Sequence, residues 1–183
     1  MEFRNDAPRY DAVARALHWT VAALVLLQIA GGLVLEELPR RTALRSFAFD
    51  AHESVGVLVI ALLALRIAWR ATHAAPVDRL AGWHAVAARA AHVALYVLMV
   101  AVPLAGYAMV DAKGYDVAVF GFAGPDLLAT DEALAKRLAA LHERLAWALV
   151  ALVAVHVAAA AWHRIVLRDD VLARMLPPRG HAA

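Results

Sequence analysis

The sequence predicts an all-α integral membrane protein, a four-helix bundle in which every helix crosses the bilayer. Apolar residue types make up 63% of the 183 residues, against roughly 45–50% in an ordinary soluble domain. Mean hydropathy is +0.63, and long stretches without a formal charge recur along the chain. No internal repeat, low-complexity run or linker interrupts this pattern, so we treat residues 1–183 as one transmembrane domain.

Three of the predicted spans are long and uncharged. Ala16–Leu35 has twenty residues, Ala90–Val110 has twenty-one and Leu145–His163 has nineteen. Each can cross a hydrocarbon core of ~30 Å at ~1.5 Å per residue. With the charged residues that flank them, the spans cover approximately residues 16–35, 90–110 and 142–165.

The remaining span, Phe47–Trp69, is predicted on weaker grounds. Its uncharged centre, Ser54–Leu65, has only twelve residues. It spans the bilayer if Asp50 and Glu53 lie at one interface and Arg66 extends its head group to the other. An even number of spans fits the charge distribution best.

The first span and the longest connection need separate interpretation. Asp6 and Asp11 precede the first apolar stretch, which is too long for a cleavable signal peptide, so we expect it to be retained. Within the connection Asp111–Leu141, the stretch Val117–Pro125 is too short to cross and is predicted as a loop. A helix-like stretch follows at Asp131–Leu141, which Asp131 can cap.

The charges predict that both termini are cytoplasmic. The termini and the second connection together carry eleven Lys and Arg with six acids, whereas the other side carries seven with ten acids. Positive charge accumulates on the cytoplasmic side of short loops. Trp19, Trp69 and Trp162 all fall near the same predicted inner interface, as interfacial aromatic residues do.

Composition excludes several chemistries. Cysteine is absent, which removes disulfides, thiolate zinc sites, Cys-ligated iron–sulfur clusters, thiol catalysis and c-type haem attachment. The formal net charge of +2 is too small to indicate nucleic-acid binding. Any metal or cofactor must therefore be held by His, Met, Tyr or carboxylate, and there are nine His.

Six histidines lie within or at the ends of the spans. Four of them fall inside uncharged runs, namely His18, His92, His156 and His163. The other two, His52 and His142, lie near the outer ends of the second and fourth spans. An ionisable side chain at membrane depth is by default a candidate functional residue. A hydrogen bond to a neighbouring helix explains any single one of them, but explains six together much less well.

Their spacing predicts two stacked cofactors. His142 and His156 are fourteen residues apart and His163 follows seven later, so all three face one seam of a left-handed bundle. The rise between the first two is about 21 Å. His52 is level with His142 at the outer end, and His18 faces the part of the fourth span that holds His156 and His163.

Two bis-His b-type haems explain this arrangement, because imidazole is a common haem ligand and bundle interiors are common haem sites. The fold class is therefore a four-helix membrane bundle enclosing two b-type haems. Spacing alone permits either His156 or His163 as the inner ligand. Gly31, Gly32 and Gly56 leave room for a porphyrin, although close helix packing also explains small residues in membrane helices.

Several segments resemble the bacterial cytochrome b561 family, over essentially the whole chain. They are Leu17-His18-Trp19, Asp50-Ala51-His52-Glu53-Ser54-Val55-Gly56, Ala91-His92-Val93, Leu141-His142-Glu143, His156 to His163, and Val171-Leu172-Ala173-Arg174-Met175-Leu176-Pro177. The resemblance implies a dihaem protein of the bacterial inner membrane. It also implies that His18 and His156 ligate the inner haem iron, and His52 and His142 the outer one.

The resemblance further implies an activity. Family members pass electrons between a donor and ubiquinone, and one branch, which this chain resembles in length and motif order, oxidises superoxide at the periplasmic face. We therefore expect a superoxide:ubiquinone oxidoreductase, with a small anion or a protein as periplasmic donor. The outer loop Asp111–Lys136 is acidic and keeps little of the family pattern beyond Phe120-Gly121, and donor identity depends on that loop.

Other polar residues have two readings each. His92 and His163 border a quinone or a haem propionate, or else hydrogen-bond to a helix backbone; His73, His84 and His181 are expected in solvent. Three arginines at the inner end pair with propionates or anchor the inner interface: Arg15, Arg66 and Arg89.

The outer side has a net charge of about −3. A group of cations near the outer His residues can nevertheless focus superoxide, or these cations merely anchor the helix ends. The group consists of Lys136, Arg137 and Arg144, with Arg40, Arg41 and Arg45.

Two other functions fit parts of the pattern. One is a haem b subunit that docks a dehydrogenase- or hydrogenase-type partner on the same fold. The other is a His-bearing transporter without haem, which typically contains broken half-helices. Pro103 and Gly106 in the third span are the only hint of such a break, and a simple kink explains them.

Overall fold

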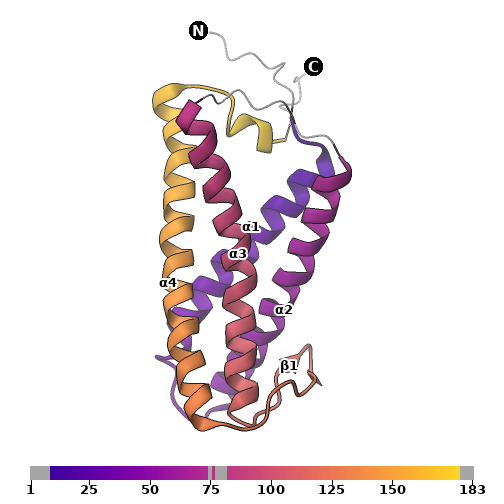
Figure 1. Cartoon of the computed structure of the whole chain (residues 1–183), viewed down its shortest axis with the longest axis vertical. Coiled ribbons are helices and arrows are strands. Elements are labelled where there is room, and N and C mark those ends of the chain that lie inside the picture. Colours follow the sequence, from indigo (N-terminus) through magenta and orange to yellow (C-terminus); the bar gives the residue numbers. More distant parts are fainter. Residues whose placement is uncertain (1–8, 74–75, 77–81, 178–183) are drawn as a thin grey trace.

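The computed structural model describes residues 9–73, 76 and 82–177. It contains four long helices, α1 (Ala12–Leu35), α2 (Ala43–Thr72), α3 (Gly82–Ala112) and α4 (Glu132–Trp162), arranged as a bundle (Figure 1). All four are long and apolar enough to cross a membrane, which confirms the predicted fold class. The expectations for Asp6 and His181 fall outside the described residues.

Capping residues decide where α1 and α2 begin. Asp11 Oδ1 accepts a hydrogen bond from the Ala14 backbone N–H at 2.9 Å, so α1 starts four residues before the uncharged run. That bond, helped by one from the Trp69 side chain, holds the pKa of the Asp11 carboxyl below its usual value. Thr42 Oγ1 accepts from the Arg45 backbone N–H at 3.2 Å, and α2 therefore also starts earlier than hydropathy indicates.

The helix-like stretch expected at Asp131–Leu141 and the fourth span form one continuous helix. Asp131 caps the helix through a hydrogen bond from the Leu134 N–H at 3.0 Å, as expected, but the helix then continues without a break to Trp162. A π-helical turn, η1 (His163–Leu167), and a short 3-10 helix, η2 (Ala173–Met175), follow it. The charged first third of α4 conceals this continuity, because hydropathy detects only the apolar remainder.

The stretch predicted as a loop contains a small hairpin instead. Strands β1 (Ala118–Val119) and β2 (Phe122–Ala123) pair antiparallel, and both turn residues between them have positive φ, as a tight hairpin turn requires. Two side chains of α2 hold the hairpin. Glu53 Oε2 accepts from the Ala118 N–H at 2.8 Å, and Ser54 Oγ from the Phe120 N–H at 2.9 Å.

Helix α3 is continuous through Pro103, so the half-helix break that a transporter would need is not formed there. Helix α3 packs along α4, α1 packs along α2, and α2 packs along α3. Within the described residues, neither α1 nor α2 packs along α4 in this way. A buried apolar cluster fills the middle of the bundle, formed by Val21, Val25, Val59, Leu95 and Leu149.

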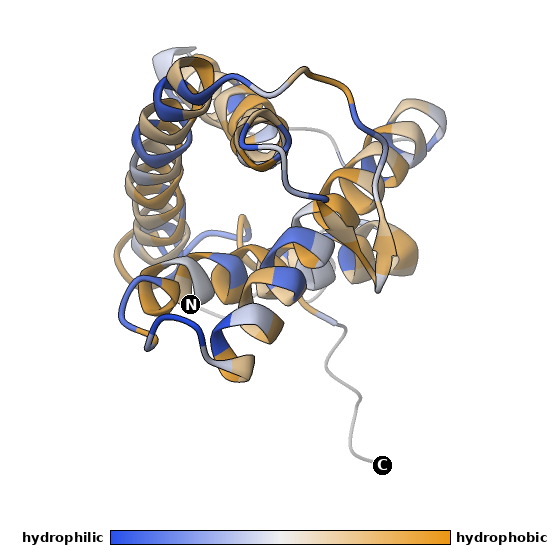
Figure 2. Ribbon diagram, turned by 90° about the horizontal axis from the view of Figure 1, so that it is seen from below, coloured by the Kyte–Doolittle hydropathy of each residue, from blue (hydrophilic) through white to orange (hydrophobic). Residues whose placement is uncertain are grey.

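The two ends of the bundle differ. We call the end where α1 begins and α4 ends the terminal end, and the end that carries β1 and β2 the hairpin end (Figure 1). At the terminal end, Trp19 Nε1 donates to the Met175 carbonyl at 2.7 Å. At the hairpin end, Arg45 Nη1 donates to the carbonyls of Leu35 and Leu38, both at 2.7 Å. Figure 2, seen from the hairpin end, shows hydrophobic residues along all four helices.

The head group of Arg66, which was predicted to extend to the inner interface, is enclosed by neighbouring helices. Only 7% of its surface is exposed. Its Nη1 donates to the Ala14 carbonyl of α1 at 3.0 Å, and its Nε donates to the Tyr96 hydroxyl of α3 at 3.3 Å. The guanidinium therefore lies inside the bundle between three helices.

Candidate functional site

One pair of histidines faces across the bundle near the hairpin end. His52 on α2 and His142 on α4 have ring centres 6.5 Å apart, with their planes at 78°. The helices that carry them are not packed directly on one another, so the two rings meet across the interior of the bundle.

A second pair lies near the terminal end. His18 on α1 and His156 on α4 also have ring centres 6.5 Å apart, at 69°. His92 on α3 lies closer to His156, at 5.4 Å. His163, which spacing alone left as an alternative partner of His18, instead places its Nδ1 2.5 Å from a carboxylate oxygen of Asp169. The residue opposite His18 is thus His156.

The two separations of 6.5 Å fit imidazoles on opposite sides of one metal ion. Such rings have centres about 6.3 Å apart, because a metal–nitrogen bond is about 2.0–2.1 Å and each nitrogen lies about 1.1 Å from its ring centre. At 5.4 Å, the His92 and His156 rings are too close for that arrangement. The described residues contain no cluster of three or more His, Cys, Asp or Glu suited to a metal ion. A pair of facing imidazoles suits a metal that brings its other ligands with it, as haem iron does.

The hydrogen bonds of the hairpin-end pair support this fit. The Nδ1 atom of His142 lies 2.9 Å from the carbonyl oxygen of Val102. A carbonyl only accepts, so Nδ1 carries the proton and Nε2 of the neutral ring keeps its lone pair for a metal. His52 Nδ1 is buried and has no hydrogen-bond partner in the part of the chain that the structure describes.

Glycines lie against both rings of this pair, but only Gly106 is needed to make space for one. A Cβ at Gly32 would lie 3.6 Å from His52 Cε1, and one at Gly106 would lie 3.0 Å from His142 Nδ1. Gly106 therefore lets the His142 ring approach α3, a role that its reading as part of a kink missed. Gly56 faces Gln28 and Pro103 instead, each at 3.4 Å, so close helix packing explains it.

A fourteen-residue spacing recurs on every helix, although the sequence interpretation used it only for the fourth span. It relates His18 to Gly32, His52 to Arg66, His92 to Gly106, and His142 to His156. Fourteen residues rise about 21 Å along a helix. The bundle thus has a hairpin-end layer with two His and two Gly, and a terminal-end layer with three His and one Arg. Halfway between them lie the buried residues Val25, Val59 and Leu149.

Two of the six cations that were predicted to form a rim at the hairpin end, Lys136 and Arg45, have protein partners. Lys136 pairs with Glu132 at 2.8 Å, and both side chains are highly exposed. Arg45 donates hydrogen bonds to backbone carbonyls at the end of α1. Arg137 and Arg144 are exposed on α4. The predicted cationic rim therefore consists mainly of these last two arginines together with Arg40 and Arg41.

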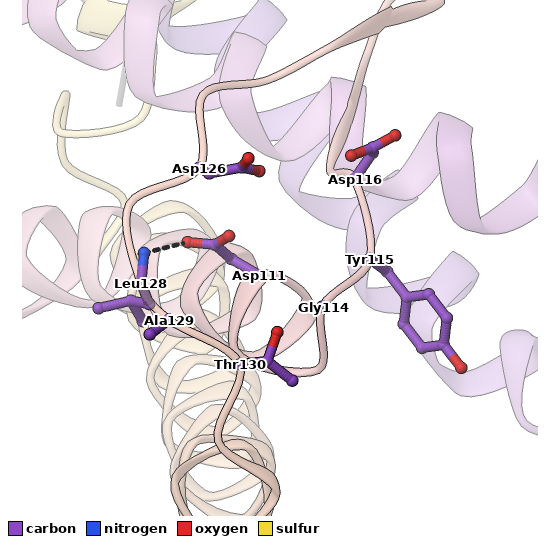
Figure 3. A pocket seen from close by; sticks show the side chains of 8 residues that line it. All are labelled: Asp111, Gly114, Tyr115, Asp116, Asp126, Leu128, Ala129 and Thr130. Carbon is purple, nitrogen blue, oxygen red and sulfur yellow. Dashed lines mark hydrogen bonds between the residues drawn. The ribbon is translucent and has the colours of Figure 1, made fainter.

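The acidic connection is tied to the end of α3. Asp111 is 4% exposed, and its Oδ2 accepts from the backbone N–H groups of Leu127 and Leu128, both at 2.8 Å. A small cavity opens beside it, with Asp116 and Asp126 on its wall and the Tyr115 ring directed away (Figure 3). Asp111 thus positions the loop that covers this end of the bundle.

Comparison with known proteins identifies the relatives of this chain. The family model of prokaryotic cytochrome b561 matches residues 9–178. Cytochrome b561 homolog 2 of Escherichia coli (strain K12) is 36% identical over 179 residues, which cover 96% of this chain and 95% of that protein. Cytochrome b561 homolog 1 of the same organism is 25% identical, over 93% and 98% of the two chains. A protein named probable superoxide oxidase CybB, of Yersinia pestis, is 27% identical, over 93% and 97%.

Proposed function

The chain belongs to the prokaryotic cytochrome b561 family, and we propose that it carries electrons from superoxide through two b-type haems to ubiquinone. As a family member it is a multi-pass membrane electron-transfer protein that uses b-type haem. The number of haems, their ligands, the donor and the acceptor belong to the proposal. The observation that carries it is the presence of two facing His pairs, each with ring centres 6.5 Å apart.

In this proposal, His52 and His142 hold the hairpin-end haem, and His18 and His156 the terminal-end haem. When bound, haem supplies one-electron oxidation and reduction at its iron. The histidines of the chain would supply the nitrogen ligands, and the Val102 carbonyl would orient the ring of His142. The apolar layer between the pairs keeps water and protons out of the path.

The proposed direction of electron transfer follows from the distribution of Lys and Arg between the two ends of the bundle. The terminal end and the connection between α2 and α3 carry eleven of the eighteen Lys and Arg, which supports a cytoplasmic terminal end and a periplasmic hairpin end in the bacterial inner membrane. Superoxide then reacts at the hairpin end. The name of the Yersinia pestis relative supports this donor, and Arg137 and Arg144, exposed on the helix that carries His142, offer positive charge that can attract an anion to this end of the bundle.

Ubiquinone is proposed to react near the terminal-end pair. Two superoxide anions lose one electron each and become dioxygen, and the quinone takes up both electrons and two protons. His92 lies beside His156, and His163 with Asp169 forms an imidazole–carboxylate pair at the same end of the bundle. Such a pair can relay a proton to a reduced quinone.

The test uses the full chain purified in lipid nanodiscs. We expect two low-spin b haems per chain, reduction by enzymatically generated superoxide, and one ubiquinol formed per two superoxide anions. Superoxide dismutase should abolish the reduction and the ubiquinol formation. A chain that binds both haems yet reacts with neither superoxide nor quinone would instead support a haem subunit that needs a dehydrogenase- or hydrogenase-type partner. A chain that binds no haem would contradict both and favour the transporter.

A further inference from the structure

Arg66 is a buried cation that forms no ion pair with a carboxylate of the residues that the structure describes. It lies in the membrane-spanning helix α2, is 7% exposed, and forms hydrogen bonds to two neutral groups, the Ala14 carbonyl and the Tyr96 hydroxyl. A guanidinium has five N–H donors and stays charged. Among the described residues no carboxylate forms an ion pair with it. Because an unpaired charge is costly at this depth, the site calls for an anion from elsewhere.

The position of Arg66 indicates where that anion belongs. Ala14 lies one helical turn before His18, and Tyr96 lies one turn after His92. Arg66 itself is fourteen residues beyond His52, in the terminal-end layer. The guanidinium is therefore held by α1 and α3 at the level of the His18 and His156 pair. The hairpin-end layer has glycines at the corresponding places on α1 and α3, and no cation.

We infer that Arg66 binds a propionate carboxylate of the haem held by His18 and His156, and thereby raises the reduction potential of that haem. This inference rests on the proposed function, which places a haem there. Haem carries two propionates, and the planar fork of an arginine suits a carboxylate.

The charge has a consequence for electron flow. Reduction removes one positive charge from the iron centre, so a nearby fixed cation favours the reduced form. One unit charge at about 10 Å, with an effective dielectric constant of about 20, changes such an equilibrium on the order of tenfold. Since the hairpin-end layer lacks an equivalent cation, Arg66 makes the terminal-end haem the better electron acceptor of the two.

The experiment is a redox titration of both haems in the full-length protein, comparing wild type with Arg66→Met and Arg66→Lys. The haem that survives in His142→Ala identifies the terminal-end signal. We expect Arg66→Met to lower the reduction equilibrium constant of that haem about tenfold, or about 59 mV for one electron, and to leave the hairpin-end haem unchanged. Arg66→Lys should keep most of the wild-type potential.

Two controls separate charge from packing. Tyr96→Phe removes a hydrogen-bond partner of Arg66 but keeps its charge, and Arg70→Met removes a charge one turn along α2; both should leave the potentials unchanged. Selective loss of the terminal-end haem in Arg66→Met, with retention in Arg66→Lys, would also support the inference. Two retained haems with unaltered potentials in Arg66→Met would overturn it, as would equal shifts in the Met and Lys variants. A wild-type protein with fewer than two haems would overturn the proposed function as well.

Discussion

His142 on α4 donates a hydrogen bond from Nδ1 to the carbonyl oxygen of Val102 on α3, over 2.9 Å. The bond fixes the tautomer, so Nε2 of the neutral ring keeps its lone pair, and the ring faces His52 with its centre 6.5 Å away. It exists because Gly106, four residues beyond Val102, offers no side chain where the ring lies. One glycine thus determines how an imidazole on another helix is presented.

Replacing Gly106 by Ala should therefore disturb the hairpin-end haem. The added Cβ would lie 3.0–3.1 Å from His142 ring atoms, and the ring must shift away from Val102. We expect a loss or a high-spin conversion of about half the haem, read from absorbance and electron paramagnetic resonance. Gly56→Ala is the matched control, because its new Cβ would meet Gln28 and Pro103 rather than a histidine. Equal effects of both substitutions would contradict this role of Gly106.

The paired His residues should act as two independent sets. Replacing His52 or His142 by Ala should remove about half the haem and spare the terminal-end signal, and replacing His18 or His156 should do the reverse. Pyridine-haemochrome quantitation with low-temperature spectra measures both. His163→Ala is expected to keep both haems, since the ring that faces His18 across the bundle is that of His156. Loss of the terminal-end haem in that variant, with retention in His156→Ala, would reverse the assignment of the ligand.

The helices and the His pairs were predictable because their causes are local. Uncharged runs define the spans, and a fourteen-residue spacing places two His at different depths of α4. The position of the hairpin was not predictable, because it depends on bonds from Glu53 and Ser54 to backbone groups about sixty-five residues away. The burial of Arg66 likewise depends on groups of two other helices, and no local pattern in α2 reveals them.

The absence of cysteine makes the topology directly measurable. A single Cys at Glu132, whose side chain is 83% exposed, should react with a membrane-impermeant maleimide in spheroplasts if the hairpin end is periplasmic. A Cys added after Ala183 should react only after the cells are lysed. The unmodified chain has no thiol and serves as the blank. The opposite labelling pattern would invert the bundle and move the quinone to the other face.

Substitutions at the terminal end should slow transfer to quinone. His92→Phe and His163→Phe remove imidazoles that can pass protons, and positioned proton donors contribute about 10²–10⁴-fold. We expect reoxidation of the pre-reduced protein by ubiquinone to slow at least tenfold in one of them, while reduction of the hairpin-end haem is unchanged. Asp169→Asn should reproduce the effect of His163→Phe if the pair acts together. Normal reoxidation in both His variants and in the double variant would leave these residues a structural role only.

Superoxide reduction should depend on the charge around His142 more than on the total charge of that face. The face is acidic on average, but at 0.1 M salt the Debye length is about 10 Å, so nearby charges dominate the field that the anion meets. Arg137 and Arg144 are exposed on the helix that carries His142, whereas Lys136 is paired with Glu132. We expect the stopped-flow rate to fall as ionic strength rises, and the double substitution Arg137→Gln and Arg144→Gln to slow it about two- to five-fold at low salt.

Lys136 provides the sharper comparison, because each member of its pair with Glu132 can be neutralised in turn, with opposite effects on the local charge. Glu132→Gln removes the partner carboxylate at 2.8 Å, leaves Lys136 uncompensated and adds one net positive charge, so the rate should rise and its salt dependence steepen. Lys136→Gln should do the opposite, by a smaller factor than the double arginine variant, since the pair is already close to neutral. Arg70→Gln removes one positive charge, as Lys136→Gln does, but at the terminal end, and it should leave the rate unchanged. A rate that rises with salt, or that follows net charge wherever the substitution is made, would contradict local focusing and leave these cations as anchors of the helix ends.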